Sequence, residues 1–128
     1  MTPEIILVTH PGIASCLLQT AGAIMNGAEL KVHIVEIPMD EDFEISRSKI
    51  LELIERLNNK TEILILNDIC GATPFNVARS FISEHIKVLS GVNMNMLLRA
   101  ITYQALPLDQ LVEKAREGGI NGVRLNLE

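Results

Sequence analysis

Four short runs of β-branched and aliphatic residues constrain the fold of this chain more than any other feature. The runs are residues 4–9 (EIILVT), 30–37 (LKVHIVEI), 61–67 (TEILILN) and 86–90 (IKVLS). The first and third are nearly continuous in hydrophobicity, which is typical of central strands that are buried on both faces of a parallel sheet. We therefore expect four strands, with the first and third at the centre of the sheet.

Segments with helical spacing of apolar residues lie between these runs. Their apolar residues are, in chain order, Ile13, Leu17, Ala21 and Ile24, then Ile50, Ile54 and Leu57, then Ala78, Phe81 and Ile82. Two further helices are expected over about 93–104 and 107–117, the second entered through Pro107 and ended by Gly118 and Gly119. The alternation predicts an α/β fold, a doubly wound open sheet of four parallel strands with helices on both faces, because parallel crossovers are right-handed.

The strand order that we expect is 2-1-3-4, with the first strand in the middle. After Gly119, Val123, Leu125 and Leu127 alternate with polar residues, which is typical of a half-exposed strand. We expect residues 120–127 to form an antiparallel C-terminal edge strand. An edge strand with an open apolar face tends to pair with another chain, so a homodimer is also expected.

Composition and charge restrict the class of protein. A length of 128 residues predicts a single domain over 1–128, and the net charge of −5 with scattered Lys and Arg makes nucleic acid an unexpected partner. No apolar run approaches the roughly 18 residues that span a bilayer, and Met1 leads directly into a strand, so we expect a soluble, cytoplasmic protein without membrane insertion. Cys16 and Cys70 form no CxxC motif and are expected to be reduced thiols.

A histidine and an aspartate are expected to meet at the carboxyl edge of the sheet. His10, in the stretch THPG, ends the first strand, and Asp68 ends the third. In the order 2-1-3-4 the winding reverses between these two strands, which is where ligands bind in such sheets. Neighbouring strands lie about 4.8 Å apart, so the imidazole and the carboxylate can form a hydrogen bond. Alternatively, His10 is a structural histidine that forms a hydrogen bond with a loop carbonyl.

The stretch CGATPFN after Asp68 resembles a helix start. Gly71 permits a tight turn, Thr73 can cap the helix, and Pro74 suits its first position. Free backbone N–H groups at a helix start favour an anion such as phosphate, although most Thr-Pro pairs are plain caps. Asp68 would fix the tautomer of His10 and leave the other ring nitrogen as a nucleophile, so the site suits a phosphohistidine.

Other chemistries find little support in the sequence. His33 and His85 are interpreted as packing or surface residues, and no metal-ligand spacing accompanies them. The sequence contains no GxSxG, GxxxxGK or GxGxxG motif of the usual hydrolase and nucleotide-binding sites. Cys70 is interpreted as a small loop residue. We expect neither a metal nor a cofactor.

Three motifs in order resemble the IIA domain of the mannose-family sugar phosphotransferase systems. They are THPG, close to Gly-Thr-His-Gly, DICGATPFN, close to Asp-x-x-Gly-Gly-Ser-Pro-Phe-Asn, and SGVNMNMLL, close to Gly-Val-Asn-x-Pro-Met-Leu. The resemblance runs essentially end to end. It implies a cytoplasmic carrier that accepts a phosphoryl group from the protein HPr and passes it to a IIB component, without a cofactor. The resemblance also implies a dimer, in which the C-terminal strand can be exchanged between subunits.

The resemblance also implies roles for individual residues. His10 would carry the phosphoryl group, Asp68 would orient it, and Thr73 with Gly71 and Ala72 would contact the phosphate. The residues expected to line the pocket or contact a partner are Pro11, Gly12, Pro74, Phe75, Asn76, Gly91, Asn93 and Met94.

This chain departs from the family pattern at Pro11, Ala72 and Asn95, and Pro11 removes a backbone N–H. Two alternatives stay open at this point. One is a phosphocarrier subunit of the dihydroxyacetone kinase type, and the other is a sensor module that binds an anion or a partner without catalysis.

Overall fold

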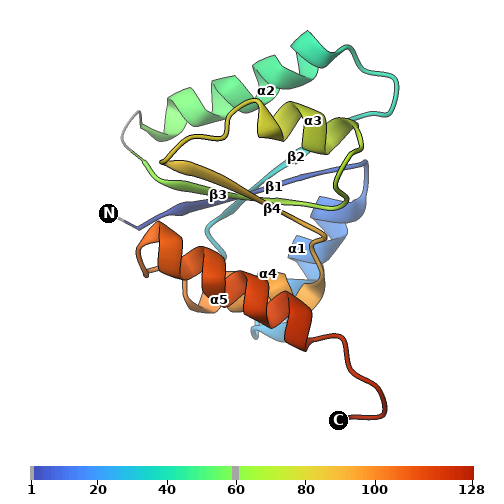
Figure 1. Ribbon diagram of the computed structural model, residues 1–128, viewed down its shortest axis with the longest axis vertical. Coiled ribbons are helices and arrows are strands. Elements are labelled where there is room, and N and C mark those ends of the chain that lie inside the picture. The colour runs from blue at the N-terminus through green and yellow to red at the C-terminus, as the bar shows by residue number, and fades with distance from the viewer. Residues whose placement is uncertain (1, 59–60) are drawn as a thin grey trace.

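A parallel four-stranded sheet forms the centre of the computed structural model, which describes residues 2–58 and 61–128 (Figure 1). The strands are β1 (Glu4–Thr9), β2 (Val32–Glu36), β3 (Ile63–Asn67) and β4 (Ile86–Ser90). Their order is β2-β1-β3-β4, and all three pairings are parallel. The predicted order 2-1-3-4 is confirmed.

The two central strands bury side chains on both faces of the sheet. Along β1, Ile5 and Leu7 belong to one hydrophobic cluster, whereas Ile6 and Val8 belong to the other. All four side chains are fully buried. Successive side chains of a strand point to opposite faces, so a strand covered on both sides must be apolar at every position. This requirement explains the nearly continuous hydrophobicity of the first run.

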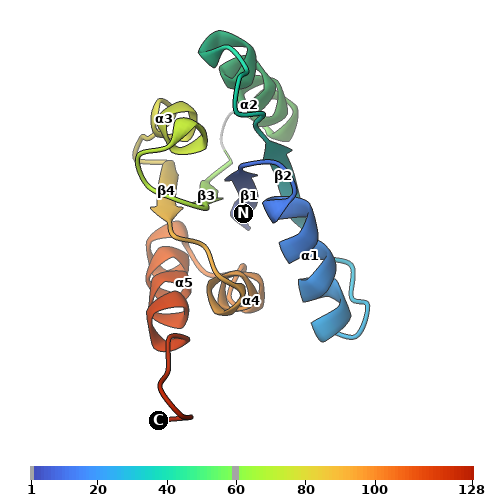
Figure 2. The same cartoon turned by 90° about the vertical axis from the view of Figure 1, so that its right-hand side faces the viewer.

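Helices cover both faces of the sheet, as predicted. Figures 1 and 2 show α2 (Phe43–Leu57) and α3 (Thr73–Arg79) on one face and the remaining helices on the other. Those remaining helices are α1 (Ile13–Ile24), α4 (Met94–Thr102) and α5 (Leu108–Asn121). None of the helices that the structure describes is both long and apolar enough to cross a bilayer.

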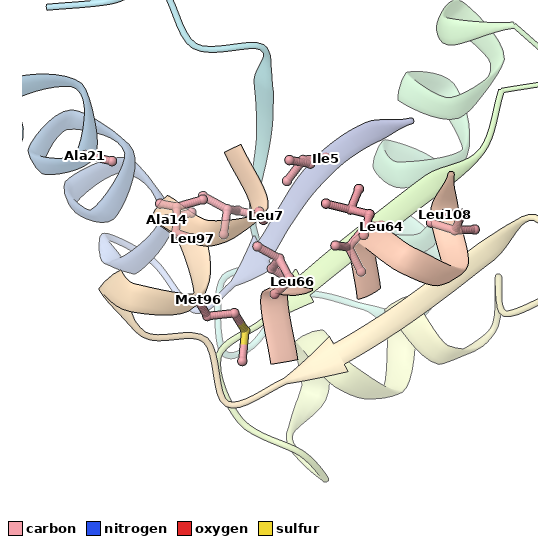
Figure 3. Close-up of a cluster of buried hydrophobic side chains, with 12 residues drawn as sticks. Ile5, Leu7, Ala14, Ala21, Leu64, Leu66, Met96, Leu97 and Leu108 are labelled. Atoms are coloured by element: carbon pink, nitrogen blue, oxygen red, sulfur yellow. The ribbon is translucent and has the colours of Figure 1, made fainter. Parts of the chain in front are cut away.

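The larger core lies between the sheet and helices α1, α4 and α5. Figure 3 shows Leu64 of β3 beside Leu108 of α5, and Leu7 of β1 beside Leu97 of α4. Complete burial of such a side chain contributes roughly 1.5–3 kcal/mol relative to its exposure to water. The buried members of this core that the structure describes are aliphatic side chains and Met96, without an aromatic residue. Because all the strand pairings are parallel, the carboxyl ends of the strands lie at one edge of the sheet.

The third helix is shorter than the apolar spacing predicted. It ends at Arg79, so Phe81 and Ile82 lie beyond it. The backbone N–H of Phe81 donates to the carbonyl of Ala78 at 3.0 Å, and that of Ile82 donates to the carbonyl of Arg79 at 3.2 Å. These bonds span three residues instead of four, so the chain tightens as it leaves the helix.

The prediction that Gly118 and Gly119 end the last helix is wrong, because α5 continues through both to Asn121. A Cβ atom on Gly118 would lie 2.7 Å from Cβ of Arg99, and one on Gly119 would lie 2.7 Å from Cε of Met96. Both glycines therefore allow α5 to approach α4 closely. The pair serves helix packing and not helix termination.

The predicted C-terminal edge strand is also not present. The structure describes all of residues 123–128, and none of them lies in a strand. They form a bend and a turn that lead away from the sheet (Figures 1 and 2). The side chains of Val123, Leu125 and Leu127 are 81%, 66% and 94% exposed. Because α5 runs on past the glycines, the tail starts beyond the end of the sheet, where it meets no strand of its own chain.

Candidate functional site

His10 lies in the corner between β1 and α1, and buried Thr9 holds that corner in place. The hydroxyl of Thr9 donates to the carbonyl of His10 at 2.8 Å and accepts the backbone N–H of Ala14 at 3.0 Å. Gly12 then turns the chain with a φ of +87°, a conformation that favours glycine. The strand end, the tight turn and the helix start thus fix the backbone from which the imidazole projects.

The predicted hydrogen bond between His10 and Asp68 is present. Nδ1 of His10 lies 2.6 Å from Oδ2 of Asp68, and the backbone N–H of His10 donates to the same oxygen at 3.1 Å. The side chains are 23% and 9% exposed, so the pair lies at the rim of the sheet and not in the deep core. A carboxylate at Nδ1 favours the tautomer with its proton on Nδ1, which leaves a lone pair on Nε2.

The other oxygen of Asp68 is held by its own neighbours. Oδ1 accepts the backbone N–H of Ile69 at 3.1 Å and the side-chain amide of Asn67 at 3.2 Å. Asn67 is completely buried, and the sequence reasoning did not select it. The available signal was a polar amide at the end of the otherwise apolar run ILILN. A buried amide needs hydrogen-bond partners, so its position at the strand end called for an explanation.

The loop from β3 to α3 contains the residues predicted to contact phosphate. Gly71 has a φ of +92°, which confirms that a glycine is needed for this turn. The N-cap of α3 is Ala72, and Thr73 is the first helical residue, so the prediction that Thr73 caps the helix is wrong. The first bond of the helix runs from the N–H of Asn76 to the carbonyl of Ala72 at 3.0 Å. The chain turns one residue earlier than the sequence pattern indicated, and the Thr73 hydroxyl is not needed as a cap.

The structure places the residues predicted to line a pocket or contact a partner in three segments of the chain. Pro11 and Gly12 are exposed in the β1–α1 corner, and the structure places Pro74, Phe75 and Asn76 in the first half of α3, with Pro74 buried. Gly91, Asn93 and Met94 instead surround the start of α4.

Asn93 has a structural role in the fold. Its Oδ1 accepts the N–H of Met96 at 2.9 Å as the N-cap of α4, and its Nδ2 donates to the carbonyl of Gly119 at 3.0 Å. Gly91 and Asn93 help to line a cavity of about 280 Å³ between β4, α4 and α5, which His10 does not line. The cap explains Asn93 without a ligand.

A carboxylate of the chain binds the N-terminus of α1, beside the His10 corner. Oε2 of Glu36, at the end of β2, accepts the backbone N–H of Ser15 at 2.9 Å and its hydroxyl at 2.8 Å. These bonds, with a further one from the backbone of Gly12, hold the pKa of Glu36 below its ordinary value of 4.5. Sequence reasoning did not select this residue. Its only signal was an acidic side chain at the end of a strand that neighbours β1.

The remaining histidines lie apart from the His10–Asp68 pair, and neither cysteine forms a disulfide. Nε2 of His33 lies 2.9 Å from Oε2 of Glu4, and Nε2 of His85 lies 3.2 Å from Oε1 of Glu84, so both pair with glutamates away from His10. Cys16 and Cys70 are free and exposed. Across residues 2–58 and 61–128, no group of three or more His, Cys, Asp or Glu side chains is arranged to hold a metal ion.

Together, the fold and the site define a doubly wound α/β protein with a histidine–aspartate pair at the point where the winding reverses. The model of the family described as "PTS system fructose IIA component" matches residues 4–116. The chain therefore belongs to this family of phosphotransferase-system (PTS) IIA components. The match confirms the resemblance that the three motifs indicated.

Relatives of known name agree with this assignment. The chain is 31% identical over 128 residues to the PTS system mannose-specific EIIAB component of Escherichia coli strain K12, and the match covers 97% of this chain. It spans only 39% of the length of that relative. It is 29% identical over 101 residues to the PTS system fructose-specific EIIA component of Bacillus subtilis strain 168, covering 77% of this chain and 68% of that protein.

Solved structures share the fold. The mannose/sorbose-specific IIA subunit of the phosphotransferase system from Enterococcus faecalis superposes with a TM-score of 0.89 at 24% identity, covering 98% of this chain and 95% of that one. The phosphotransferase system component EIIA from Streptococcus agalactiae gives a TM-score of 0.80 at 27% identity, covering 95% of each chain. These similarities agree with a mannose-family IIA domain and do not favour a subunit of the dihydroxyacetone kinase type.

Proposed function

We propose that this chain is a phosphohistidine carrier, in which Nε2 of His10 accepts a phosphoryl group and passes it on. The observation that carries the proposal is the 2.6 Å contact between His10 Nδ1 and Asp68 Oδ2, which leaves Nε2 as the nucleophile. Membership of the IIA family supports it, since a component of a phosphotransferase system handles phosphoryl groups.

The transfer step needs positioning and charge balance more than acid–base chemistry. The Nε2 lone pair of His10 attacks phosphorus, a P–N bond forms, and the donor's own P–N bond breaks with its electron pair returning to the donor nitrogen. Positive charge then grows on the His10 ring, whose proton stays on Nδ1. Asp68 stabilises that charge, as a carboxylate does for an imidazolium. The reverse sequence delivers the phosphoryl group to the next acceptor.

The phosphoryl group on Nε2 would be bound by the loop that precedes α3 and by the first residue of that helix. The residues proposed for this are Gly71 and Ala72, through backbone N–H groups, and Thr73, through its hydroxyl. Their place after Asp68, whose carboxylate already contacts His10, supports this assignment. Pro11 has no N–H to offer on the other side, and the start of α1 is already bonded to Glu36.

The proposed partners are the phosphocarrier HPr as donor and a IIB component as acceptor, in sugar uptake or its regulation in the cytoplasm. The Escherichia coli relative is named an EIIAB component, and this chain spans 39% of it. Ile13 and Ile69 are 40% and 56% exposed, and they lie in the segments that follow His10 and Asp68. An exposed apolar rim around a charged centre suits transient protein docking.

We also propose that the chain forms a homodimer through its C-terminal tail. Val123, Leu125 and Leu127 are exposed, and β4 pairs with β3 alone among the described strands. An unpaired edge and an exposed apolar segment can satisfy each other across a two-fold axis. The homodimer therefore stays a prediction, although the tail forms no strand within its own chain.

The test of the carrier function is incubation with phosphoenolpyruvate, the first enzyme of the pathway and HPr, followed by intact mass measurement. We expect one phosphoryl group per chain, which is lost in acid and kept in alkali because the P–N bond of a phosphohistidine is acid-labile. Omission of HPr should abolish the label. A chain that stays unmodified under these conditions would behave as the sensor module and would overturn the proposal.

A further inference from the structure

A series of partly buried hydrogen bonds leads from β4 to the His10 site. The hydroxyl of Ser90 donates to Oδ1 of Asn67 at 3.0 Å, and Nδ2 of Asn67 donates to Oδ1 of Asp68 at 3.2 Å. Oδ2 of Asp68 contacts Nδ1 of His10 at 2.6 Å. Ser90 and Asn67 are register partners in neighbouring strands, so the sheet itself places them side by side. These hydrogen bonds therefore link β4, β3 and the end of β1 through polar side chains.

The orientation of the Asn67 amide follows from its partners. Its two N–H groups donate to the carbonyl of Val8, at 3.1 Å, and to the carboxylate of Asp68. Rotation of the amide by half a turn would bring its oxygen against these two acceptors and leave Ser90 facing a donor. The carbonyl of Val8 and the carboxylate of Asp68 can only accept, so they fix the orientation in which the N–H groups face Asp68, and the Ser90 hydroxyl satisfies the amide oxygen in that orientation.

In this orientation the two oxygens of Asp68 have different hydrogen-bond partners. Oδ1 accepts from Asn67 and from the N–H of Ile69, whereas Oδ2 remains for the backbone and ring of His10. The terminal torsion of an aspartate is otherwise broad, so a carboxylate without such bonds rotates readily. Asn67 holds the carboxylate at the angle that a short bond to Nδ1 requires.

Packing alone does not account for an asparagine at this position. The four preceding residues of β3 are apolar and buried, and Asn67 is fully buried as well. An amide in such a place costs stability unless all of its hydrogen bonds are made, whereas an aliphatic side chain would carry no such cost. The backbone carbonyl of Asn67 also accepts the N–H groups of Gly91 and Val92, at 2.9 and 3.0 Å, which ties the end of β4 to the same residue.

We infer that Asn67 and Ser90 are positioning residues for phosphoryl transfer, which keep Asp68 oriented so that His10 stays in the Nδ1–H tautomer. The inference rests on the proposed function of His10, because the tautomer matters for transfer only if Nε2 is the nucleophile. Neither residue touches the phosphoryl group. Their effect passes through Asp68 alone.

The first part of the experiment measures the tautomer, which does not depend on phosphorylation. Histidine-selective ¹⁵N NMR of the full chain separates a protonated from an unprotonated ring nitrogen. We expect one tautomer of His10 in the unsubstituted protein and a mixture in Asn67→Leu and in Ser90→Ala. Ser90→Thr keeps the hydroxyl and should restore the single tautomer.

The second part measures the rate of phosphoryl uptake from phospho-HPr by the same proteins. We expect a loss of about tenfold in Asn67→Leu, as removal of one hydrogen bond to a charged group would give, a smaller loss in Ser90→Ala and none in Ser90→Thr. The matched control is Ser46→Ala, which removes the hydroxyl of a fully buried serine. That hydroxyl donates to Glu41 at 2.8 Å and takes no part in the hydrogen bonds from Ser90 to His10. It should leave the tautomer and the rate unchanged.

The outcomes separate this inference from the proposed function. A single His10 tautomer together with an unchanged rate in Asn67→Leu would overturn the inference. If that variant does not fold, the comparison of Ser90→Ala with Ser90→Thr decides, and equal behaviour of the two would overturn it. If the unsubstituted protein takes no label but its tautomer responds to Ser90→Ala, the proposed function fails while the hydrogen-bonding role of the pair stands.

Discussion

Oδ2 of Asp68 accepts the backbone N–H of His10 and contacts the Nδ1 of the same residue, although the two residues are 58 positions apart in the chain. The first bond fixes the position of the histidine backbone relative to β3, and the second fixes the orientation of the ring. Because both bonds converge on one oxygen, a change at Asp68 affects the position and the tautomer of His10 together.

Replacement of Asp68 by asparagine should slow phosphoryl transfer from HPr by at least about tenfold, or roughly 1.4 kcal/mol of barrier. The amide keeps the shape of the carboxylate but can present an N–H to the ring nitrogen, and it carries no charge to balance the phosphorylated ring. Rapid-quench kinetics would measure the rate, and circular dichroism should show an unchanged fold. A variant that transfers at the rate of the unsubstituted protein would remove Asp68 from the mechanism.

Replacement of His10 by alanine should abolish phosphorylation, because His10 is the histidine that the structure pairs with Asp68 at the reversal point of the sheet. The matched control is His33→Ala, since His33 also pairs with a carboxylate but lies next to Glu4. Intact mass measurement should find the label in the control and none in His10→Ala. The opposite pattern would show that the site has been assigned to the wrong histidine.

Replacement of Glu36 by glutamine should lower the free energy of unfolding by about 1 kcal/mol at neutral pH, because a carboxylate that bonds the start of α1 is replaced by a neutral amide. The Ser15 bonds hold the pKa of Glu36 below its ordinary value of 4.5 in the folded state. The stabilisation is therefore present above that ordinary value and is lost as the pH falls through the folded-state pKa.

Urea unfolding of both proteins over a range of pH would measure this effect. The difference between them should shrink toward zero in acid. The control is Glu52→Gln on the exposed face of α2, which should match the unsubstituted protein throughout. A difference that stays constant down to low pH would contradict the assignment of the effect to the Glu36 carboxylate.

Replacement of Gly118 by alanine should destabilise the protein by about 1–3 kcal/mol, although alanine is the better helix former. The added Cβ would lie 2.7 Å from Cβ of Arg99 and 3.2 Å from the backbone carbonyl of Asn95, so α4 and α5 must separate. Gly22→Ala in α1 is the matched control, since a Cβ there meets no atom within 4 Å. It should leave stability unchanged or raise it by up to about 1 kcal/mol in thermal unfolding. Equal effects of the two substitutions would argue against the close packing of α4 and α5.

Deletion of residues 123–128 should convert the proposed homodimer into a monomer, because the deletion removes the exposed apolar side chains of the tail and leaves α5 intact. Sedimentation velocity at micromolar concentration would distinguish the two states. Leu125→Ser serves as a milder variant that keeps the chain length and should weaken the dimer. The hypothesis fails if the full-length chain sediments as a monomer at that concentration.

The sequence by itself determined the architecture and the histidine–aspartate pair at the carboxyl edge of the sheet. Strands such as residues 4–9 are recognisable because burial on both faces demands an uninterrupted apolar run, and such runs are expected at the centre of a doubly wound sheet, which agrees with the order 2-1-3-4. Once β1 and β3 are neighbours, the residues that follow them must meet at the same edge. For that reason His10 and Asp68 could be paired from the sequence.

Only the tertiary structure decided what depends on side-chain register and on the distance between helices. The sequence predicted a helix end at Gly118 and Gly119 because glycine is common at the ends of helices. Only the close approach of α4 shows that the two glycines are packing residues. The bonds from Ser90 to Asn67 and from Ser15 to Glu36 join neighbouring elements at particular registers, which no local pattern specifies. The tail from Val123 alternates like a strand, yet alternation shows only which side chains could share a face. A strand also needs a neighbour for its backbone N–H and C=O groups, and the length of α5 carries the tail away from every strand of its own chain.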